Sequence, residues 1–300
     1  MNRRHFLHAL GGTTAALATM KLNALLASPT TPRMPVLFFG HGNPMNAIEE
    51  NEFVREFRAQ AAHLPETPRA IVCVSAHWET RGTKVTAMPN PRTIHDFGGF
   101  PQALFEVQYP APGDPGLAAD VAALASSALQ RHVELDHAWG LDHGTWSVVK
   151  HLFPLADVPV LQLSLDRQAS ASEHLALGAT LAALRRRGVL IIGSGNLVHN
   201  LRAVAWDRMG EPFGYDWALE ASADIQAALR SRDWRVLGAF AGLDSSVERS
   251  AAMRQAVPTP EHFLPVLYVA GLLEADEDFA FFNDRPLAGS LTMTGIRSLA

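Results

Sequence analysis

The sequence predicts a single α/β domain built on a mostly parallel central sheet that is flanked by helices. Four short apolar runs have the length of buried strands and lie at residues 35–39, 70–74, 158–163 and 189–192. Amphipathic stretches lie between these runs and predict helices at residues 51–64, 117–129 and 170–187. Alternation of strands and helices along the chain is typical of a parallel sheet covered by helices.

The rest of the chain fits the same domain. Residues 215–274 have a mainly helical pattern, and residues 279–282 predict a closing strand. No linker of Gly/Ser or Pro character divides residues 28–300, so we assign them to one domain. Hydrophobic residues make up 48% of the 300 residues and charged residues 18%, which provides a sizeable core and excludes a disordered chain.

Charge and cysteine content restrict the function. The formal net charge of −5 gives no support to electrostatic binding of nucleic acid. The single cysteine cannot form an internal disulfide or a thiolate zinc site. Any metal site must therefore use imidazole and carboxylate ligands, and the chain contains thirteen histidines.

Residues 1–27 resemble a twin-arginine export signal and not a part of the folded domain. Residues 3–7 read RRHFL and precede a weakly apolar stretch, and Ala27 could end a small-residue cleavage site. This stretch is too short, and too interrupted by Gly and Thr, for a stable membrane span. We therefore expect a periplasmic protein exported by the twin-arginine machinery, with a cytoplasmic protein as the alternative.

Three histidines follow predicted strands. His41 comes one residue after the first apolar run, His77 follows the second after Ser-Ala, and His199 lies in a short loop past the fourth. Sites in open parallel sheets form at the carboxyl ends of strands, so these imidazoles could converge on one metal. His262 would join them from the helical part near the C-terminus. The alternative for each histidine is that it is an ordinary polar residue at the end of a helix or strand, with its hydrogen bonds satisfied locally.

Two other histidines have settings that indicate chemistry. His143 lies in an Asp-His-Gly turn before a predicted helix, where the helix dipole would keep its ring neutral and suited to acid–base catalysis. The simpler interpretation, compatible with the first, is that Asp142 caps that helix. His95 lies in a loop with Phe97 and Phe100, whose rings could wall an apolar substrate. The alternative is that His95, Phe97 and Phe100 only pack against one another in a surface loop and do not contact a substrate.

Several segments together resemble the class III extradiol ring-cleaving dioxygenases, and in particular the 4,5-DOPA extradiol dioxygenase type. The resemblance spans residues 35–271 and rests on GHGNPMNAIEENEF, SAHW, TIHDFGGFPQALFEVQYPAPG, LDHGTW, GSGNLVHN and PTPEHFLPVLYVAG. It implies that residues 28–300 form an extradiol dioxygenase-like catalytic domain. It also implies a metal held by four histidines and a catalytic acid/base at His143. The implied ligands are His41, His77, His199 and His262.

The resemblance implies one divalent metal, with Fe(II) required for activity and Zn(II) also able to occupy the same ligands. The implied substrates are O₂ and a DOPA-like catechol, and His199 is left open as a ligand or a second acid/base. We expect His95, Phe97 and Trp146 to contact the substrate, with Trp78 and Phe100 helping to exclude water. The alternatives are a zinc-dependent hydrolase on the same scaffold and a non-enzymatic periplasmic metal-binding protein.

Overall fold

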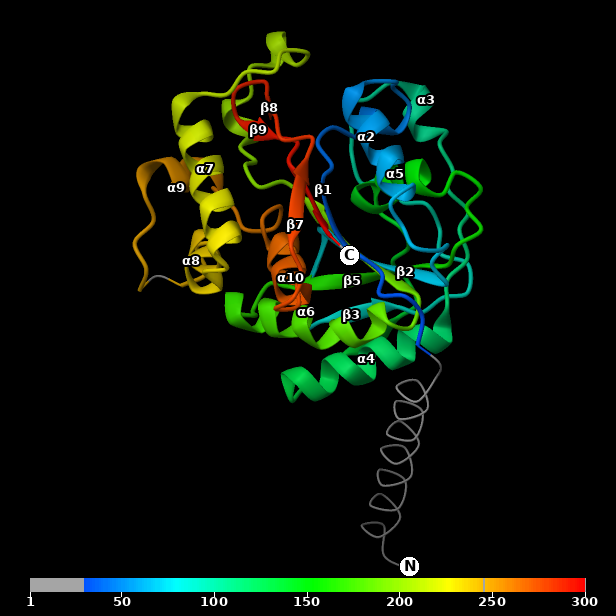
Figure 1. Ribbon diagram of the computed structural model, residues 1–300. Helices are drawn as coiled ribbons and strands as arrows, with labels where there is room; N and C mark the ends of the chain where they lie inside the picture. The colour runs from blue at the N-terminus through cyan, green and yellow to red at the C-terminus, as the bar shows by residue number, and fades with distance from the viewer. Residues whose placement is uncertain (1–29, 245, 300) are drawn as a thin grey trace, which may run out of the picture.

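One eight-stranded sheet runs through the protein (Figure 1). The computed structural model describes residues 30–244 and 246–299, so the predicted export signal lies outside the described residues. The strand order is β4-β3-β5-β2-β6-β1-β10-β7. These strands are β1 (Val36–Gly40), β2 (Ala70–Thr80), β3 (Lys84–Thr86), β4 (Glu134–Asp136), β5 (Val160–Asp166), β6 (Val189–Gly195), β7 (Phe279–Phe282) and β10 (Gly295–Ser298).

The four predicted apolar runs form the centre of this sheet. They are β1, β2, β5 and β6, and the neighbouring pairs β1–β6, β6–β2 and β2–β5 are all parallel. Antiparallel pairing occurs toward the edges, where β10 joins β1 to β7 and β3 joins β5. The mostly parallel sheet is therefore confirmed. The sequence did not predict β3, β4 and β10, because none of them contains a run of consecutive apolar residues.

The helices agree with the predicted segments. The stretches 51–64, 117–129 and 170–187 contain α2 (Glu52–Ala61), most of α4 (Pro115–Leu129) and α6 (Ala171–Arg185). The helical region after residue 215 divides into α7 (Asp216–Ser231), α8 (Trp234–Phe240), α9 (Ala251–Ala256) and α10 (Leu264–Leu272). The other elements are α3 (Gln102–Phe105), α5 (His143–Leu152), the 3₁₀ turns η1 (Pro44–Ala47), η2 (Leu201–Ala203) and η3 (Trp206–Arg208), and a small hairpin of β8 (Pro286–Leu287) and β9 (Leu291–Thr292).

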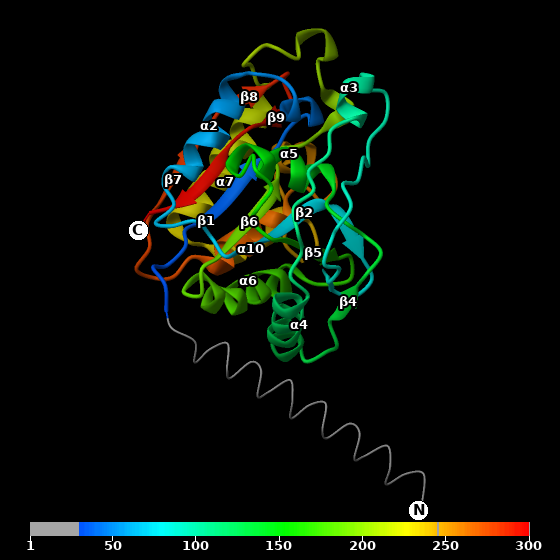
Figure 2. The same ribbon diagram turned by 90° about the vertical axis from the view of Figure 1, so that its right-hand side faces the viewer.

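Two helical layers cover the sheet, with α4 and α6 below it and α2 and α5 above it (Figure 1 and Figure 2). Side chains of a strand point alternately to its two faces. In β1, Val36 and Phe38 accordingly pack in the core formed with α4, α6 and α10. Leu37 and Phe39 pack in the core formed with α2 and α5. Both faces of the central strands are thus buried, which explains why their sequences are continuous apolar runs.

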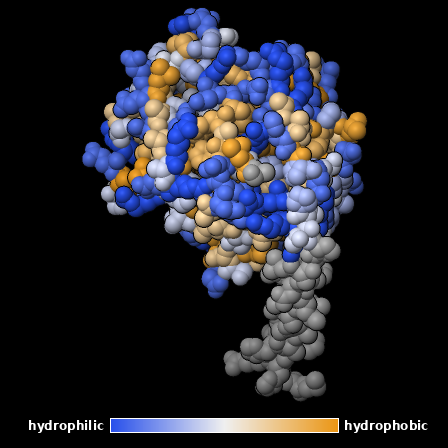
Figure 3. Space-filling view, viewed as in Figure 1, coloured by the Kyte–Doolittle hydropathy of each residue, from blue (hydrophilic) through white to orange (hydrophobic). Residues whose placement is uncertain are grey.

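Hydrophilic residues cover much of the face of the molecule seen in Figure 3, with smaller apolar areas between them. Within residues 30–244 and 246–299, no helix is both long and apolar enough to cross a membrane. The strands β2, β6 and β1 are neighbours at the centre of the sheet and run parallel, so their carboxyl ends lie side by side along one edge. The predicted histidines follow these strand ends.

Candidate active site

Five histidines from separate parts of the chain line one cavity of about 460 Å³. His41 follows β1, His77 lies in the last part of β2, and His199 follows β6. His143 begins α5, and His262 lies just before α10. The structure therefore brings together every histidine that the sequence predicted as a ligand or as the acid/base. The full lining is His41, Gly42, Asn43, Pro44, His77, Phe97, Gly98, Gly99, Phe100, His143, His199, Leu201, Trp206, Met209, His262 and Leu291.

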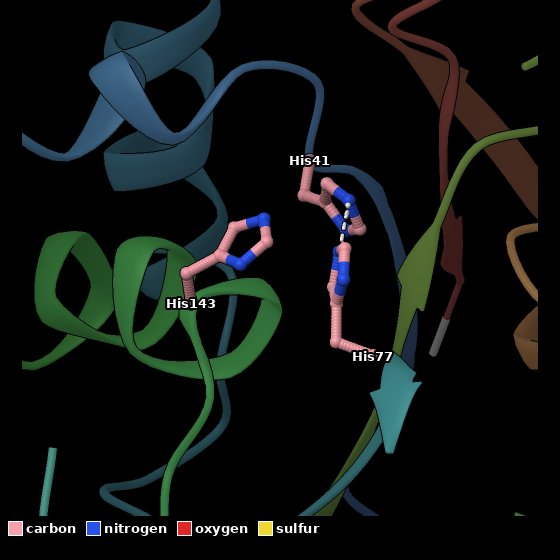
Figure 4. Close-up of side chains that lie close together, drawn as sticks. All are labelled: His41, His77 and His143. Atoms are coloured by element: carbon pink, nitrogen blue, oxygen red, sulfur yellow. Dashed lines mark hydrogen bonds between the residues drawn. The ribbon is translucent and has the colours of Figure 1, made fainter. Parts of the chain in front are cut away.

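Three of these rings form a tight group, shown in Figure 4. The Nε2 atoms of His41 and His77 face each other at 3.2 Å, and the ring of His143 points toward both. The ring centroids of His77 and His143 are 3.9 Å apart. His262 closes the other side of the group, with its centroid 5.4 Å from His41 and 5.0 Å from His77.

Hydrogen bonds fix the proton positions on His41. The hydroxyl of Ser194 in β6 donates its one hydrogen to the carbonyl oxygen of Gly144 at 2.6 Å. Ser194 Oγ can then only accept from Nδ1–H of His41, which lies 2.9 Å away. The Nε2 atom of His41 therefore carries a lone pair that points toward His77. A histidine held through one nitrogen so that the other is free is the usual arrangement of a metal ligand.

Asp96 holds two of the rings at once. Its Oδ2 atom accepts from Nδ1 of His143 at 2.9 Å and lies 3.5 Å from Nδ1 of His77. Its Oδ1 atom accepts from the backbone N–H of His143 at 2.8 Å. Burial acts to raise the pKa of Asp96, but its hydrogen bonds with His143 outweigh burial and hold that pKa below its usual value. The carboxylate is therefore ionised, and it leaves Nε2 of both rings free.

His262 is held in the same way by its neighbour Glu261. Nδ1 of His262 donates to Oε1 of Glu261 at 3.1 Å, and the hydroxyl of Thr259 donates to the same oxygen at 2.8 Å. Although burial opposes ionisation, these contacts lower the pKa of Glu261 to about 2. Burial also lowers the pKa values of His41, His77 and His262, so all three imidazoles are neutral at pH 7.

His199 differs from the other four histidines. Its ring stacks on that of His262, with centroids 3.5 Å apart and planes 10° from parallel. Burial and the proximity of His262 lower its pKa to about 3. Among the described residues, we find no hydrogen bond that orients its ring. His199 therefore adjoins the group without the fixed orientation that Ser194, Asp96 and Glu261 give the others.

The donor set fits a divalent metal. A metal 2.0–2.1 Å from two imidazole nitrogens separates those nitrogens by about 2.8–3.0 Å in octahedral coordination and by about 3.3–3.4 Å in tetrahedral coordination. The separation of 3.2 Å between His41 and His77 lies between these values, close to the tetrahedral one. Without a cation, Nε2–H of His77 can donate to the lone pair on Nε2 of His41, and a bound cation would take the place of that hydrogen. Neutral imidazoles suit iron and zinc, so the donor types alone do not choose between these metals.

Two glycines allow the strands and helices to approach this closely. A Cβ on Gly195, at the end of β6, would lie 2.1 Å from the carbonyl oxygen of His262. A Cβ on Gly144 would lie 2.6 Å from Ser75 Oγ and 2.8 Å from Cδ2 of His77. Any side chain at these positions would displace one of the histidine segments. The glycines of GSGN and DHGTW are thus part of the site.

The turn before α5 orients His143. Asp142 caps the helix, with its Oδ1 atom accepting from the backbone N–H of Thr145 at 3.1 Å, which confirms the predicted cap. The same carboxylate is buried and accepts from Ser75 at 2.7 Å and from Gln162 at 2.6 Å. The cap thereby ties the start of α5 to β2 and β5, and it fixes the position from which His143 enters the cavity.

The aromatic residues predicted to contact substrate lie at different depths. Phe97 and Phe100 line the cavity, whereas His95 and Trp146 are not among its lining residues. Nε2 of His95 lies 3.0 Å from the carbonyl oxygen of Val107, and Nε1 of Trp146 donates to that of Ile94 at 2.8 Å. Both rings pack behind Phe97, at 5.7 and 6.3 Å between centroids. The expectation of direct substrate contact at His95 and Trp146 thus differs from their observed place, since each ring is engaged with a backbone carbonyl.

Sequence reasoning missed several residues of this site. Three of them, Trp206, Leu201 and Met209, line the cavity. Trp78, which we expected to help exclude water, is buried outside that lining and stacks on Trp139 with 5.8 Å between ring centroids. Asp96 and Glu261, which hold the histidines, were not singled out either. Glu261 lies directly beside the histidine that it holds, and this adjacency was an available signal. Asp96 lies beside His95 in the sequence but contacts His143 and His77, so its role could not be read from adjacency. Ser194 gave no such signal, because its role depends on the pairing of β6 with β1.

Comparison with known proteins agrees with this geometry. A family model described as the catalytic LigB subunit of aromatic ring-opening dioxygenase matches residues 34–292. A relative named 4,5-DOPA dioxygenase extradiol from Escherichia coli (strain K12) is 44% identical over 269 residues, 89% of this chain and 96% of its own. A protein of the same name from Beta vulgaris is 35% identical, over 78% of this chain and 84% of its own.

A solved structure has the same fold. The crystal structure of the uncharacterized protein JW3007 from Escherichia coli K12 superposes with a TM-score of 0.73 at 39% identity. It covers 88% of this chain and 99% of its own. The α/β sheet and its histidine-lined cavity thus define an extradiol aromatic ring-opening dioxygenase. The chain belongs to the LigB family, the class III extradiol dioxygenases, which confirms the family that the sequence motifs indicated.

Proposed function

We propose that this protein uses Fe(II) to open the ring of a catechol-type aromatic with O₂, by cleavage beside the two hydroxyl-bearing carbons. His41, His77 and His262 would hold the metal, with His199 as a fourth group at the same centre. The observation that carries this proposal is the pair of Nε2 atoms 3.2 Å apart, each on a ring whose Nδ1 atom faces an acceptor. The family supports ring opening. Ligand atoms lie within 4.8 Å of one another in two groups, His41 with His77 and His143, and His262 with His199 and Glu261, and these two groups support a divalent metal.

Bound Fe(II) would supply the coordination positions at which a catechol and O₂ meet, which removes the entropy cost of their encounter. The protein supplies the proton chemistry. Nδ1 of His143 is engaged by Asp96, so Nε2 is the atom that can accept a proton from a catechol hydroxyl. The ionised Asp96 stabilises the resulting imidazolium, and the same nitrogen can later return the proton to the departing oxygen.

Phe97 and Phe100, from the loop that lines one side of the cavity, would limit the access of water to this centre. Phe97 packs against His143 with 5.5 Å between centroids and against Phe100 at 5.4 Å. His95 and Trp146 support Phe97 from behind. An apolar wall beside the acid/base strengthens its interaction with Asp96 and keeps bulk water from competing for the transferred proton.

Anaerobic loading with Fe(II), followed by O₂ and a panel of catechols, tests this proposal. We expect a yellow ring-opened product that incorporates both atoms of ¹⁸O₂, a mass increase of two oxygen atoms over the catechol. Zn(II)-loaded protein should give no such product. Ester or amide hydrolysis by the Zn(II) form, without ring opening by the Fe(II) form, would establish the hydrolase alternative instead. Tight metal binding without either reaction would establish a metal-binding protein.

We also propose that the protein is exported by the twin-arginine route and acts in the periplasm. The RRHFL sequence at residues 3–7 supports this proposal. Replacing Arg3 and Arg4 by Lys should retain the protein in the cytoplasm, which cell fractionation measures. Export of the double variant at the level of the parent would favour the cytoplasmic alternative or another route.

A further inference from the structure

A second pocket lies at the other end of β1 from the histidine cavity. It has a volume of about 490 Å³, and its wall includes Pro32, Pro35, Pro65 and Arg297, so we call it the proline pocket. Pro35 comes directly before β1 and His41 directly after it, so the length of this five-residue strand, about 16 Å, lies between the two places. None of the described residues that line the proline pocket also lines the histidine cavity. The proline pocket is therefore separate from the proposed ring-opening centre.

Arg297 brings an unpaired positive charge to the proline pocket. It lies in β10 directly opposite Leu37 of β1, so its side chain is on the same face of the sheet as that of Leu37. Within residues 30–244 and 246–299, its Nη1 atom is buried and has no hydrogen-bond partner, and its guanidinium forms no ion pair. Withdrawing a charged donor from water without an acceptor costs free energy. An anion bound in the pocket would supply the missing acceptor.

The acidic residue in the same wall does not take that place. Glu277 is buried, and both of its carboxylate oxygens accept from the guanidinium of Arg185, Oε2 at 2.6 Å. Oε2 also accepts from the backbone N–H of Glu274 at 2.9 Å, and Nε of Arg33 lies 3.5 Å from Oε1. The negative charge of Glu277 is thus compensated by two arginines, and the uncompensated charge of the wall is that of Arg297.

Two other side chains of the wall can contact an anion. His63 follows α2 and is exposed, so a ring nitrogen of His63 is free to turn toward the pocket. Arg33 directs its Nη1 atom to Glu274 at 3.0 Å and to Asp276 at 3.2 Å, which leaves its Nη2 atom for another acceptor. The pocket volume of about 490 Å³ lies in the usual range for small-molecule sites.

The rest of the wall favours an organic anion over an inorganic one. Pro32, Pro35, Pro65 and Leu299 contribute apolar surface, and a proline has no N–H to donate. Such a wall gives few donors to the four oxygens of a phosphate, whereas a carboxylate can take two parallel hydrogen bonds from one guanidinium. We propose that the proline pocket binds a small organic carboxylate, with the carboxylate on Arg297 and the apolar body against the prolines.

Three probes separate the charge of the ligand from its apolar body. Benzoate has both, benzamide has the ring without the charge, and acetate has the charge without the ring. Titration calorimetry of the metal-loaded protein should show saturable one-to-one binding of benzoate. Benzamide and acetate should each bind roughly tenfold or more weakly, because one lacks the charged hydrogen bonds and the other the buried apolar surface. Absence of saturable benzoate binding, or equally tight binding of benzamide, would overturn the proposal.

Two variants distinguish the proline pocket from the metal centre. Arg297→Gln should weaken benzoate roughly tenfold or more, because the amide cannot replace the charged donors. His41→Ala, which alters the histidine cavity, should leave benzoate binding unchanged. The opposite result, with benzoate retained in Arg297→Gln and lost in His41→Ala, would assign the binding to the metal centre and overturn the proposal. Ring opening by Arg297→Gln should equal that of the parent, so the outcome does not depend on the proposed function.

Two further variants control for charge and folding. Arg297→Lys keeps the charge but not the paired donors, so it should bind benzoate with an affinity between those of the parent and Arg297→Gln. Arg81 is exposed and lies outside the wall of the proline pocket, and Arg81→Gln should bind benzoate like the parent. Circular dichroism would verify that each variant is folded. Equal weakening by Arg81→Gln and Arg297→Gln would show a general attraction of anions to the protein and would overturn the proposal.

Discussion

The inner and outer walls of the cavity are built in different ways. On the inner wall, His41, His77 and His262 each present one nitrogen to the centre while Ser194, Asp96 or Glu261 engages the other. On the outer wall, residues such as Phe97 and Trp206 contribute apolar surface from loops and short turns. The inner wall is set by hydrogen bonds and strand register, and the outer wall by apolar packing. Changes inside should therefore alter chemistry, and changes outside should alter substrate choice.

The largest effect is expected from removal of a histidine on the inner wall. His41→Ala or His77→Ala should lower the metal content from about one ion per chain to near zero, because no neighbouring side chain replaces the lost donor. Elemental analysis of purified protein measures this content. The volume-retaining variants His41→Gln and His77→Gln should behave alike, and circular dichroism should show a folded protein.

The exposed His132 provides a matched control for this experiment, because it lies away from the cavity lining. His132→Ala should retain full metal and activity. Full metal occupancy in either His41→Ala or His77→Ala would refute the assignment of that histidine as a ligand. The inner wall would then differ less from the outer wall in its effect on the chemistry.

The next largest effect separates proton transfer from metal binding on the same wall. His143→Ala should keep its metal and still bind catechol, while turnover falls by roughly 10²–10⁴, the usual range for loss of a general acid/base. His143→Gln should do no better, since an amide cannot shuttle a proton. Loss of metal along with turnover would make His143 a ligand. Turnover near that of the parent would leave acid–base catalysis to His199.

The two walls also differ in how far the sequence predicted them. The strands that carry His41 and His77 are continuous apolar runs, because both faces of the sheet are covered by helices. Histidines that follow such runs can be assigned to one end of a sheet from the order of residues alone. The central strands, the helices that flank them and the convergence of the histidines were therefore predictable.

The remaining features depend on contacts between distant segments. Ser194 reaches His41 because β6 pairs with β1, and Trp206 joins the cavity across about 100 residues from Phe97. The place of Trp146 outside the cavity lining has the same cause. Its place at the start of a helix was evident, but the direction of its side chain is decided by packing against the loop that contains Ile94. Periodicity within one segment does not contain that information.

A smaller effect is expected at the carboxylate that serves two residues of the inner wall. Asp96→Asn should lower both metal affinity and turnover by roughly 10- to 100-fold, since Asp96 holds His77 as well as His143. An amide still accepts a hydrogen bond but cannot stabilise the imidazolium of His143. Metal titration and kcat measure the two effects separately. The exposed Asp224 offers a control of equal charge change, and Asp224→Asn should alter neither. Reduced turnover with parental metal affinity would show that His77 does not need this contact.

The smallest effect is expected on the outer wall, at Trp206. Its side chain lines the cavity but is 62% exposed to solvent, so its removal should disturb the fold little. Covering about 40 Å² of its ring by a substrate, at about 25 cal/mol per Å², contributes about 1 kcal/mol. Trp206→Ala should therefore raise KM for 4-propylcatechol roughly fivefold, with metal content and kcat near the parent values. Leu155→Ala, at an 81% exposed apolar residue outside the cavity lining, should leave KM unchanged. A fall in kcat or metal content in Trp206→Ala would show that the outer wall supports the inner wall, and the division between chemistry and substrate choice would then have to be abandoned.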